Sequence, residues 1–154
     1  MRSFQQFIIE TGAVVGSATQ TTKQALIQWR RIAGGRQIIQ TSDATLQFVF
    51  APTSPTDRVL FRSQYKQLLR TVLAPSPTWY DISQKLYPGQ EDITPKFVVP
   101  FITTPNAHDD YDLPTIVQWR GREWVADGHH RFIAFRLLGI SRCVVQIYKT
   151  NSDE

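Results

Sequence analysis

The sequence predicts an α+β fold in which a small mixed β-sheet is packed by two or three helices. Two stretches, residues 22–33 and 56–73, repeat apolar side chains at the spacing of a helix. A third stretch, residues 115–148, has the pattern of a β-hairpin, a tight turn, a helix and a final strand. The 154 residues are 42% hydrophobic and 12% aromatic, so we expect one domain, 1–154, with an ordinary apolar core.

The first predicted helix covers residues 22–33. Thr21 precedes it as an N-cap candidate, and Gly34-Gly35 follows it as a stop. Two β-like runs come next, at residues 37–40 and 45–50, and a cluster of proline, serine and threonine ends the second run.

The second predicted helix, residues 56–73, has a broad apolar stripe and a basic side. Its cations recur every four residues, a spacing that drifts only slowly around a helix, so they form one continuous basic ridge. These cations are Arg58, Arg62, Lys66 and Arg70. The ridge is either a solvated face or a surface that contacts the phosphates of a nucleic-acid backbone.

The middle of the chain gives weaker signals. Residues 79–87 predict a short helix, and residues 96–102 predict a strand whose Pro100 places it at a sheet edge or a strand end. An acidic loop follows at residues 106–112. The hairpin then consists of residues 115–119 and 123–126, joined by a turn at Arg120-Gly121.

The segment Asp127-Gly128-His129-His130-Arg131 follows the second hairpin strand and opens a helix that ends at Gly139. The first N–H groups of a helix have no internal partners and lie at the positive end of its dipole, so an anion, typically a phosphate, binds there. Gly128 has no Cβ and lets the backbone approach such a ligand closely. The sequence therefore predicts a phosphate site at this turn, followed by a last strand at residues 143–148.

The side chains of this segment have several candidate roles. His130, Arg131 and Arg136 are candidate phosphate-binding groups beside Gly128. His129 is a candidate general acid or base, because an imidazole titrates near neutral pH. Asp127 and His130 are further catalytic candidates. The alternative is structural: Asp127 caps the helix by accepting the first N–H groups.

The run from Pro114 to Gly139, with its D-G-H-H-R turn and a helix ending in A-F-R-L-L-G, resembles the core of the ParB/sulfiredoxin-like superfamily. Members carry a [D/G]-G-x-H-R or G-E-R-R phosphate-binding turn before a helix that ends in A-x-x-L-G. The resemblance covers residues 112–148, about a quarter of the chain. It places the ParB/sulfiredoxin-like core at residues 96–150, while residues 1–95 form a helical and β-containing N-terminal part without a recognised pattern.

The resemblance implies a ParB-like nuclease domain that binds a phosphate-bearing ligand at the turn, as a nuclease or a nucleic-acid-binding protein. One alternative is a nucleotide-dependent small-molecule kinase similar to free-serine kinases. A second is a non-catalytic interaction module of a phage or effector protein. Peroxiredoxin repair is excluded, because sulfiredoxins carry their catalytic cysteine within the turn, where this chain has His129, whereas Cys143 lies on the last predicted strand.

The expected cofactors are Mg²⁺ and a nucleotide. Asp109 and Asp110, in the acidic loop, would suit Mg²⁺ that is shared with substrate phosphates, although such loops are also common as solvated turns. Adjacent histidines point in different directions on a helix and no cysteine pair supports them, so we expect no zinc, and nothing indicates haem or flavin.

Charge and cysteine content narrow the class of protein. Residues 1–80 hold nine basic and three acidic side chains, whereas residues 81–154 hold eight and ten, so the positive excess lies in the N-terminal half. This half suits a nucleic-acid or nucleotide partner. No apolar run is long enough to predict a membrane span, and the single cysteine excludes a disulfide within the chain, which fits a cytoplasmic protein. The oligomeric state is not indicated.

Overall fold

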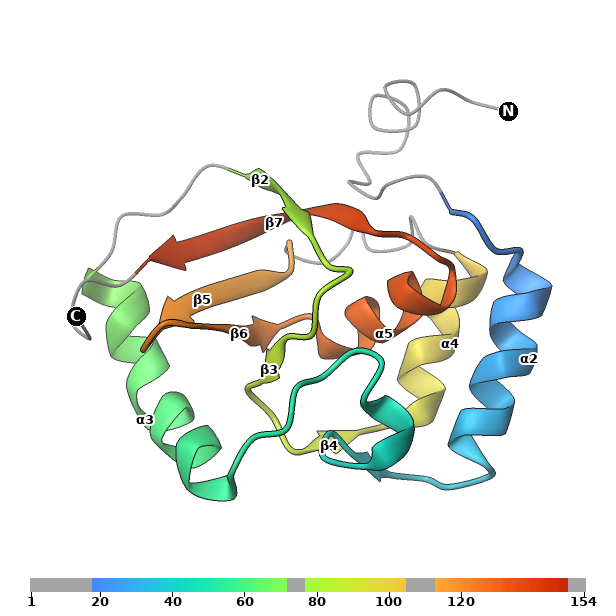
Figure 1. The fold of residues 1–154 in the computed structure, drawn as a ribbon, viewed down its shortest axis with the longest axis horizontal. Coiled ribbons are helices and arrows are strands. Elements are labelled where there is room, and N and C mark those ends of the chain that lie inside the picture. The colour runs from blue at the N-terminus through green and yellow to red at the C-terminus, as the bar shows by residue number, and fades with distance from the viewer. Residues whose placement is uncertain (1–17, 72–76, 105–112, 150–154) are drawn as a thin grey trace.

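The computed structural model describes residues 18–71, 77–104 and 113–149. The elements are, in chain order, α2 (Thr22–Ala33), β1 (Ile39–Gln40), the 3-10 helix η1 (Ala44–Leu46), α3 (Pro55–Thr71), β2 (Thr78–Asp81), β3 (Tyr87–Pro88), β4 (Asp92–Ile93), α4 (Pro95–Thr103), β5 (Thr115–Trp119), β6 (Arg122–Asp127), α5 (His129–Leu137) and β7 (Arg142–Lys149). The predicted α+β class with a small mixed sheet is confirmed (Figure 1).

Five strands form one sheet in the order β2-β7-β5-β6-β3. β5 and β6 are an antiparallel hairpin, β7 runs parallel to β5, and β2 pairs antiparallel with β7. β3 pairs parallel with β6 at one edge, while β1 and β4 form a separate two-stranded ribbon. The last described strand, β7, therefore lies inside the sheet, paired on both sides.

The segment from β5 to β7 follows the sequence prediction closely. The hairpin turns at Arg120 and Gly121, whose φ values of 53° and 69° are those of the type I′ turn that two-residue hairpins favour. Trp119 and Trp124 pack against each other near this turn with ring centroids 5.9 Å apart, as expected for cross-strand aromatics. α5 follows β6 directly and ends before Gly139.

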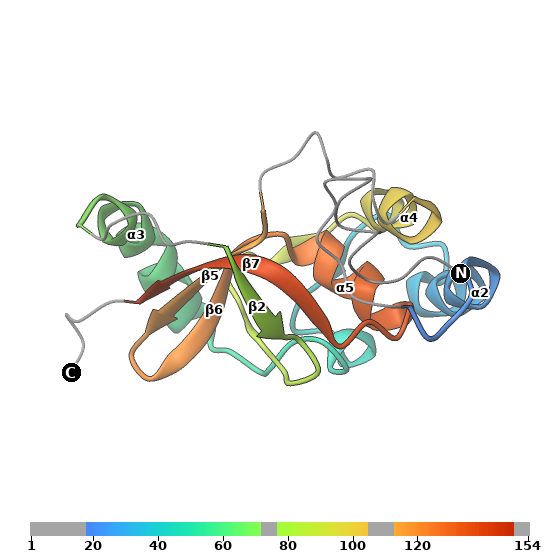
Figure 2. The same ribbon diagram turned by 90° about the horizontal axis from the view of Figure 1, so that it is seen from above.

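α5 is the central helix of the fold. Figure 2 shows α2, α4 and α5 gathered at one end of the molecule and α3 at the other, with the sheet between them. Seven of the nine residues of α5 are buried, including the polar residues His129 and Arg131. A helix covered on nearly all sides is held by packing. A smaller cluster at the α3 end packs Phe61 against Val117, Trp119 and Trp124.

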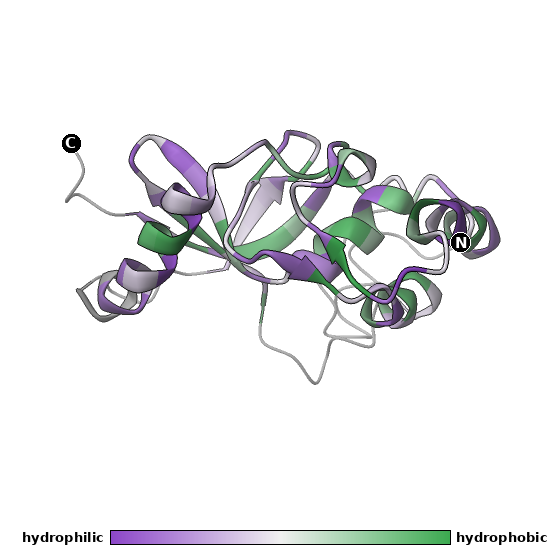
Figure 3. Ribbon diagram, turned by 90° about the horizontal axis from the view of Figure 1, so that it is seen from below, coloured by the Kyte–Doolittle hydropathy of each residue, from purple (hydrophilic) through white to green (hydrophobic). Residues whose placement is uncertain are grey.

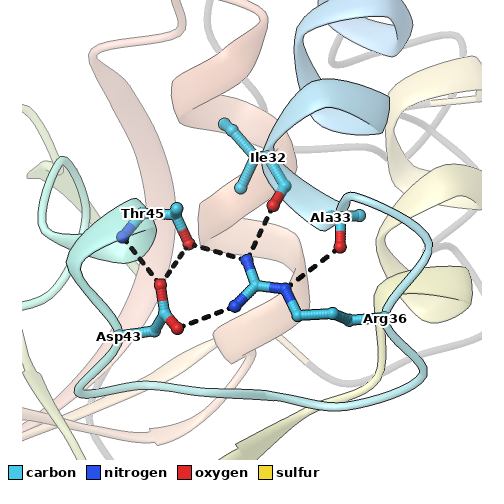
Figure 4. A network of polar contacts seen from close by, with 5 residues as sticks. All are labelled: Ile32, Ala33, Arg36, Asp43 and Thr45. Atoms are coloured by element: carbon cyan, nitrogen blue, oxygen red, sulfur yellow. Dashed lines mark hydrogen bonds and ion pairs between the residues drawn. The ribbon is translucent and has the colours of Figure 1, made fainter.

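The bounds predicted for α2 are confirmed. Thr21 accepts the N–H of Gln24 at 3.1 Å, and the Gln24 side chain accepts the N–H of Thr21 in return, which is a complete capping box. Arg36 covers the other end of the helix by donating to the carbonyls of Ile32 at 2.8 Å and Ala33 at 3.2 Å (Figure 4). A cation is favourable at this negative end of the helix dipole.

The second β-like run, residues 45–50, is wrong as a strand prediction. Asp43 accepts the backbone N–H of Thr45 at 2.9 Å and so starts the 3-10 helix η1. The same carboxylate pairs with Arg36 at 2.7 Å. The hydrogen bonds from Thr45 and Arg36 lower the pKa of Asp43 from 3.8 to about 2.

Two further element predictions are wrong. Residues 79–87 were expected to be helical, but β2 pairs with β7 through aromatic residues that favour extended backbone, and β3 begins at Tyr87. Residues 96–102 were expected to form a strand and lie in α4 instead. Pro95 at the first turn of α4 is pre-organised for a helix, and Pro100 lies inside the helix.

Candidate functional site

The turn between β6 and α5 is built around Gly128. Gly128 is the N-cap residue of α5 and has a φ of 103°, in the left-handed region that favours glycine. A Cβ at this position would lie 2.9 Å from the Cβ of Pro114. Among the described residues no side chain caps α5, so the structure does not show Asp127 as the cap; its carboxylate, 66% exposed, lies 3.6 Å from Nη2 of Arg131.

His129, the first residue of α5, is 1% exposed. Its Nε2 accepts the backbone N–H of Gly89 at 2.9 Å, which assigns the ring proton to Nδ1. Within the described part of the chain, Nδ1 is buried without a hydrogen-bond partner. Burial, and then the charges of His130 and Arg62, hold the pKa of His129 well below its usual range, so the imidazole is neutral at pH 7.

His130 makes an equivalent bond one residue later. Its Nε2 accepts the backbone N–H of Thr94, the N-cap residue of α4, at 3.1 Å, and its ring meets that of Phe97 edge-on. Burial lowers the pKa of His130 as well. The structure thus gives both rings a role other than the expected one: they tie residues 89–94 to α5 as neutral acceptors.

Gly89 is the point where α3, β6 and α5 meet. Its carbonyl accepts Nη1 of Arg62 at 2.9 Å, and its N–H also points to the carbonyl of Val125 at 3.0 Å. A Cβ on Gly89 would lie 2.2 Å from that carbonyl oxygen and 2.9 Å from the ring of Phe61. The basic helix and the turn, predicted as separate features, are therefore joined through this glycine. The sequence showed Gly89 only as part of a Pro-Gly break.

The two arginines of α5 lie at different ends of the helix. Arg131 is 4% exposed, and its Nη2 lies 3.4 Å from the position that a Cβ of Gly128 would take. Arg136 is in the last turn, eight residues after Gly128 and so about 12 Å from it along the helix axis at 1.5 Å per residue. Its Nη2 donates to the carbonyl of Phe48 at 3.2 Å. The structure therefore brings Arg131 to the predicted phosphate site and places Arg136 away from it.

The basic side of α3 is not one exposed ridge. Arg58 is 7% exposed and donates to Oγ1 of Thr53 at 3.0 Å, so the prediction of an exposed contact is wrong at this position. Arg62 is solvent-exposed but its Nη1 bonds to the backbone of Gly89. Lys66 is exposed. The side chain of Arg70 lies outside what the structure describes.

A hydrogen-bonded carboxylate on the sheet was missed by sequence reasoning. Glu123 of β6 accepts the hydroxyl of Tyr80, the amide of Gln84 at 2.9 Å and the amide of Gln118 at 3.1 Å. Burial raises the pKa of Glu123. The group fastens the segment after β2 to the sheet, and no spacing in the sequence indicated it.

The predicted metal ligands, Asp109 and Asp110, lie outside the described residues. Among the residues that the structure describes, no three or more His, Cys, Asp or Glu side chains gather as they would around a metal ion. None of the described helices is both long and apolar enough to cross a membrane.

The chain matches no protein-family model, no curated protein and no solved structure.

Proposed function

We propose that the first turn of α5 binds the phosphate group of a nucleic acid or a nucleotide, and that the chain acts as a nuclease or a nucleic-acid-binding protein of the ParB/sulfiredoxin-like kind. One observation carries the proposal: the N-cap residue of α5 is Gly128, which has no side chain to cap the helix, and the Arg131 guanidinium lies beside that glycine. Backbone donors and a cation therefore stand at one helix end.

The electrostatics of this turn favour an anion. Arg131 places a positive charge in the first turn of a helix, where the dipole is already positive, and this charge is buried. Asp127 supplies a carboxylate nearby but is 66% exposed. A phosphate bound at Gly128 would accept backbone N–H groups and a charge-assisted bond from Arg131, which are the strongest hydrogen bonds available to it.

The other predicted residues take more specific roles. His129 and His130 act as positioning residues that hold residues 89–94 against the turn. Asp127 is the most exposed of the three candidate catalytic side chains and would contact a bound substrate. Asp109 and Asp110 would hold Mg²⁺, and this ion would supply positive charge that offsets the charge of the phosphate.

Binding is tested by titrating inorganic phosphate, ATP and a short DNA oligonucleotide into the protein and following backbone amide NMR signals. We expect the amides of residues 128–131 to shift most. Arg131→Gln should weaken binding about 10- to 100-fold, the range of one charge-assisted hydrogen bond. Arg142→Gln, at an exposed arginine on β7, is the matched control and should bind as wild type does.

Two results would overturn the proposal. One is an absence of shifts at residues 128–131 with all three ligands at millimolar concentration, and the other is equal affinity of the Arg131→Gln and wild-type proteins. The NMR map needs only the wild-type protein, so the test holds even if the buried Arg131 cannot be replaced. Tight binding of ATP alone would favour the small-molecule kinase.

Catalysis is tested with plasmid DNA and Mg²⁺. We expect cleavage by the wild-type protein and its loss in Asp127→Asn, because that variant keeps the shape of the exposed side chain and removes its basicity. Equal cleavage by both proteins would remove Asp127 from the mechanism.

A further inference from the structure

Exposed cations gather at the end of the sheet where β5 turns into β6. Arg120 and Arg122 flank the turn, and Lys149 ends the neighbouring strand β7; all three are exposed. α3 packs on the same hairpin through Phe61. Figure 1 shows α3 beside this end of the sheet. The ribbon at the turn is coloured hydrophilic in Figure 3. We call Arg120, Arg122 and Lys149 the hairpin surface.

The two arginines of the hairpin surface lie on aromatic rings. The Cζ of Arg120 is 4.5 Å from the ring centroid of Trp119, and the Cζ of Arg122 is 4.9 Å from that of Tyr87. Both rings are held in place, because Trp119 packs on Phe61 at 5.8 Å and Tyr87 packs on Trp124 at 5.5 Å. Each guanidinium therefore lies at cation–π distance from a ring that is itself held by packing, and this contact restricts the arginine side chain.

A cation–π contact leaves an arginine suited to bind phosphate. The guanidinium keeps its charge and its planar fork of N–H donors, whose geometry matches a phosphate. An arginine that is already ordered loses less conformational entropy when it binds. The nearby carboxylate of Asp57 is 3.5 Å from Nη1 of Arg122, and both side chains are almost half exposed, at 44% and 45%, so this pair neutralises the surface weakly.

We propose that the hairpin surface contacts the phosphodiester backbone of a nucleic acid, without regard to base sequence. The proposal rests on the proposed function in one respect, that the partner of the chain carries phosphate. It replaces the predicted ridge on α3, in which Arg58 is buried and Arg62 is bonded to the backbone of Gly89. Repeated phosphates along one strand match neighbouring cations better than a single phosphate does.

The test compares two double variants that remove the same charge. Arg120→Gln/Arg122→Gln changes the hairpin surface, and Arg30→Gln/Arg31→Gln changes two exposed arginines in the last turn of α2, at the opposite end of the molecule. Fluorescence anisotropy with single-stranded DNA, duplex DNA and RNA of equal length, over a series of KCl concentrations, gives the affinity and its salt dependence for each protein.

We expect the wild-type protein to lose affinity steeply with salt. The hairpin variant should bind about 10-fold or more weakly at low salt, and the slope of log K against log[KCl] should fall by about 1 to 2, as for one or two lost phosphate contacts. The α2 variant should keep the wild-type slope. The strand type that shows the largest difference between the two variants identifies the nucleic acid.

Three outcomes would overturn the proposal: equal slopes for the hairpin variant and the wild type, equal losses in the two variants, or displacement of the nucleic acid by poly-glutamate at equal charge concentration. The last would assign the surface to acidic proteins. Titration of inorganic phosphate into the hairpin variant separates the two proposals. If the hairpin variant keeps the phosphate-induced NMR shifts at residues 128–131 and loses the salt dependence of nucleic-acid binding, both proposals are supported. If the salt dependence depends on the hairpin surface but phosphate causes no shifts at residues 128–131, only the hairpin-surface proposal is supported.

Discussion

Acidification is expected to destabilise the fold through His129 and His130. Both rings accept a backbone N–H through Nε2, and burial lowers the pKa of both below the usual 6.5. A histidine with a lower pKa in the folded than in the unfolded chain takes up a proton on unfolding. The stability that it contributes is therefore fully present above pH 6.5 and is lost as the pH falls toward the folded-state pKa.

The size of the effect follows from the number of protons taken up. Each histidine that is neutral when folded and protonated when unfolded changes the free energy of unfolding by about 1.4 kcal/mol per pH unit. Because His130 is less buried than His129, its ring becomes protonated in the folded protein at a higher pH than the ring of His129. His129 alone should remove about 1 kcal/mol between pH 6.5 and 5.5, and His130 should add to this loss, a substantial part of an ordinary domain's stability of roughly 5–15 kcal/mol.

The measurement is urea unfolding from pH 5.5 to 7.5, followed by tryptophan fluorescence. The control is His129→Gln/His130→Gln, because a glutamine carbonyl can accept the same backbone N–H groups and does not titrate. The carboxylates, including Glu123 with its raised pKa, are the same in both proteins, so the difference in slope isolates the two histidines. A wild-type slope equal to that of the double variant, or a wild-type protein that gains stability on acidification, would contradict this role of the two histidines.

Three other predictions can be checked by urea unfolding or NMR. Gly89→Ala should lower the free energy of unfolding by about 3 kcal/mol or more, because its Cβ would overlap a carbonyl oxygen at 2.2 Å. In Gly35→Ala the Cβ meets no atom within 4 Å, so this variant should lose only the roughly 1–2 kcal/mol of left-handed strain. Phe61→Ala should lose about 3–5 kcal/mol with its buried ring, and Val59→Ala, on the exposed side of the same helix, less than about 0.5 kcal/mol. The Asp43 carboxyl should titrate near pH 2 in NMR. The stability that it contributes is present above pH 3.8 and should be lost as the pH falls toward 2. A titration near pH 3.8 would contradict the hydrogen bonds that Asp43 accepts from Thr45 and Arg36.

Local signals predicted the parts of the fold that local interactions build. α2 begins at the Thr21 capping box and ends at Gly34 as predicted, and the hairpin turns at Arg120-Gly121. The strand β2 was missed because its pairing partner, β7, lies more than sixty residues later in the chain. α4 was missed because a short buried helix and a buried strand have similar apolar runs, and periodicity cannot separate them over nine residues.

One part of the candidate site could be predicted from the sequence, and another part could not. The N-terminal turn at Gly128 and the nearby Arg131 could be predicted, since both follow from residues adjacent in sequence. The bonding of His129 and His130 could not, because the N–H groups that they accept come from Gly89 and Thr94, 40 and 36 residues earlier. Two neighbouring histidines in a first turn give no sign that both are acceptors.

The short strand β3 limits how the sheet can grow. It has two residues, and the second, Pro88, has no N–H to offer to another strand. Leu86, the residue before β3, already donates its N–H to the carbonyl of Val49 at 3.0 Å and accepts the N–H of Ala51 at 2.8 Å. The β3 edge of this sheet therefore offers few backbone groups to a strand from another molecule, in a complex or in an aggregate.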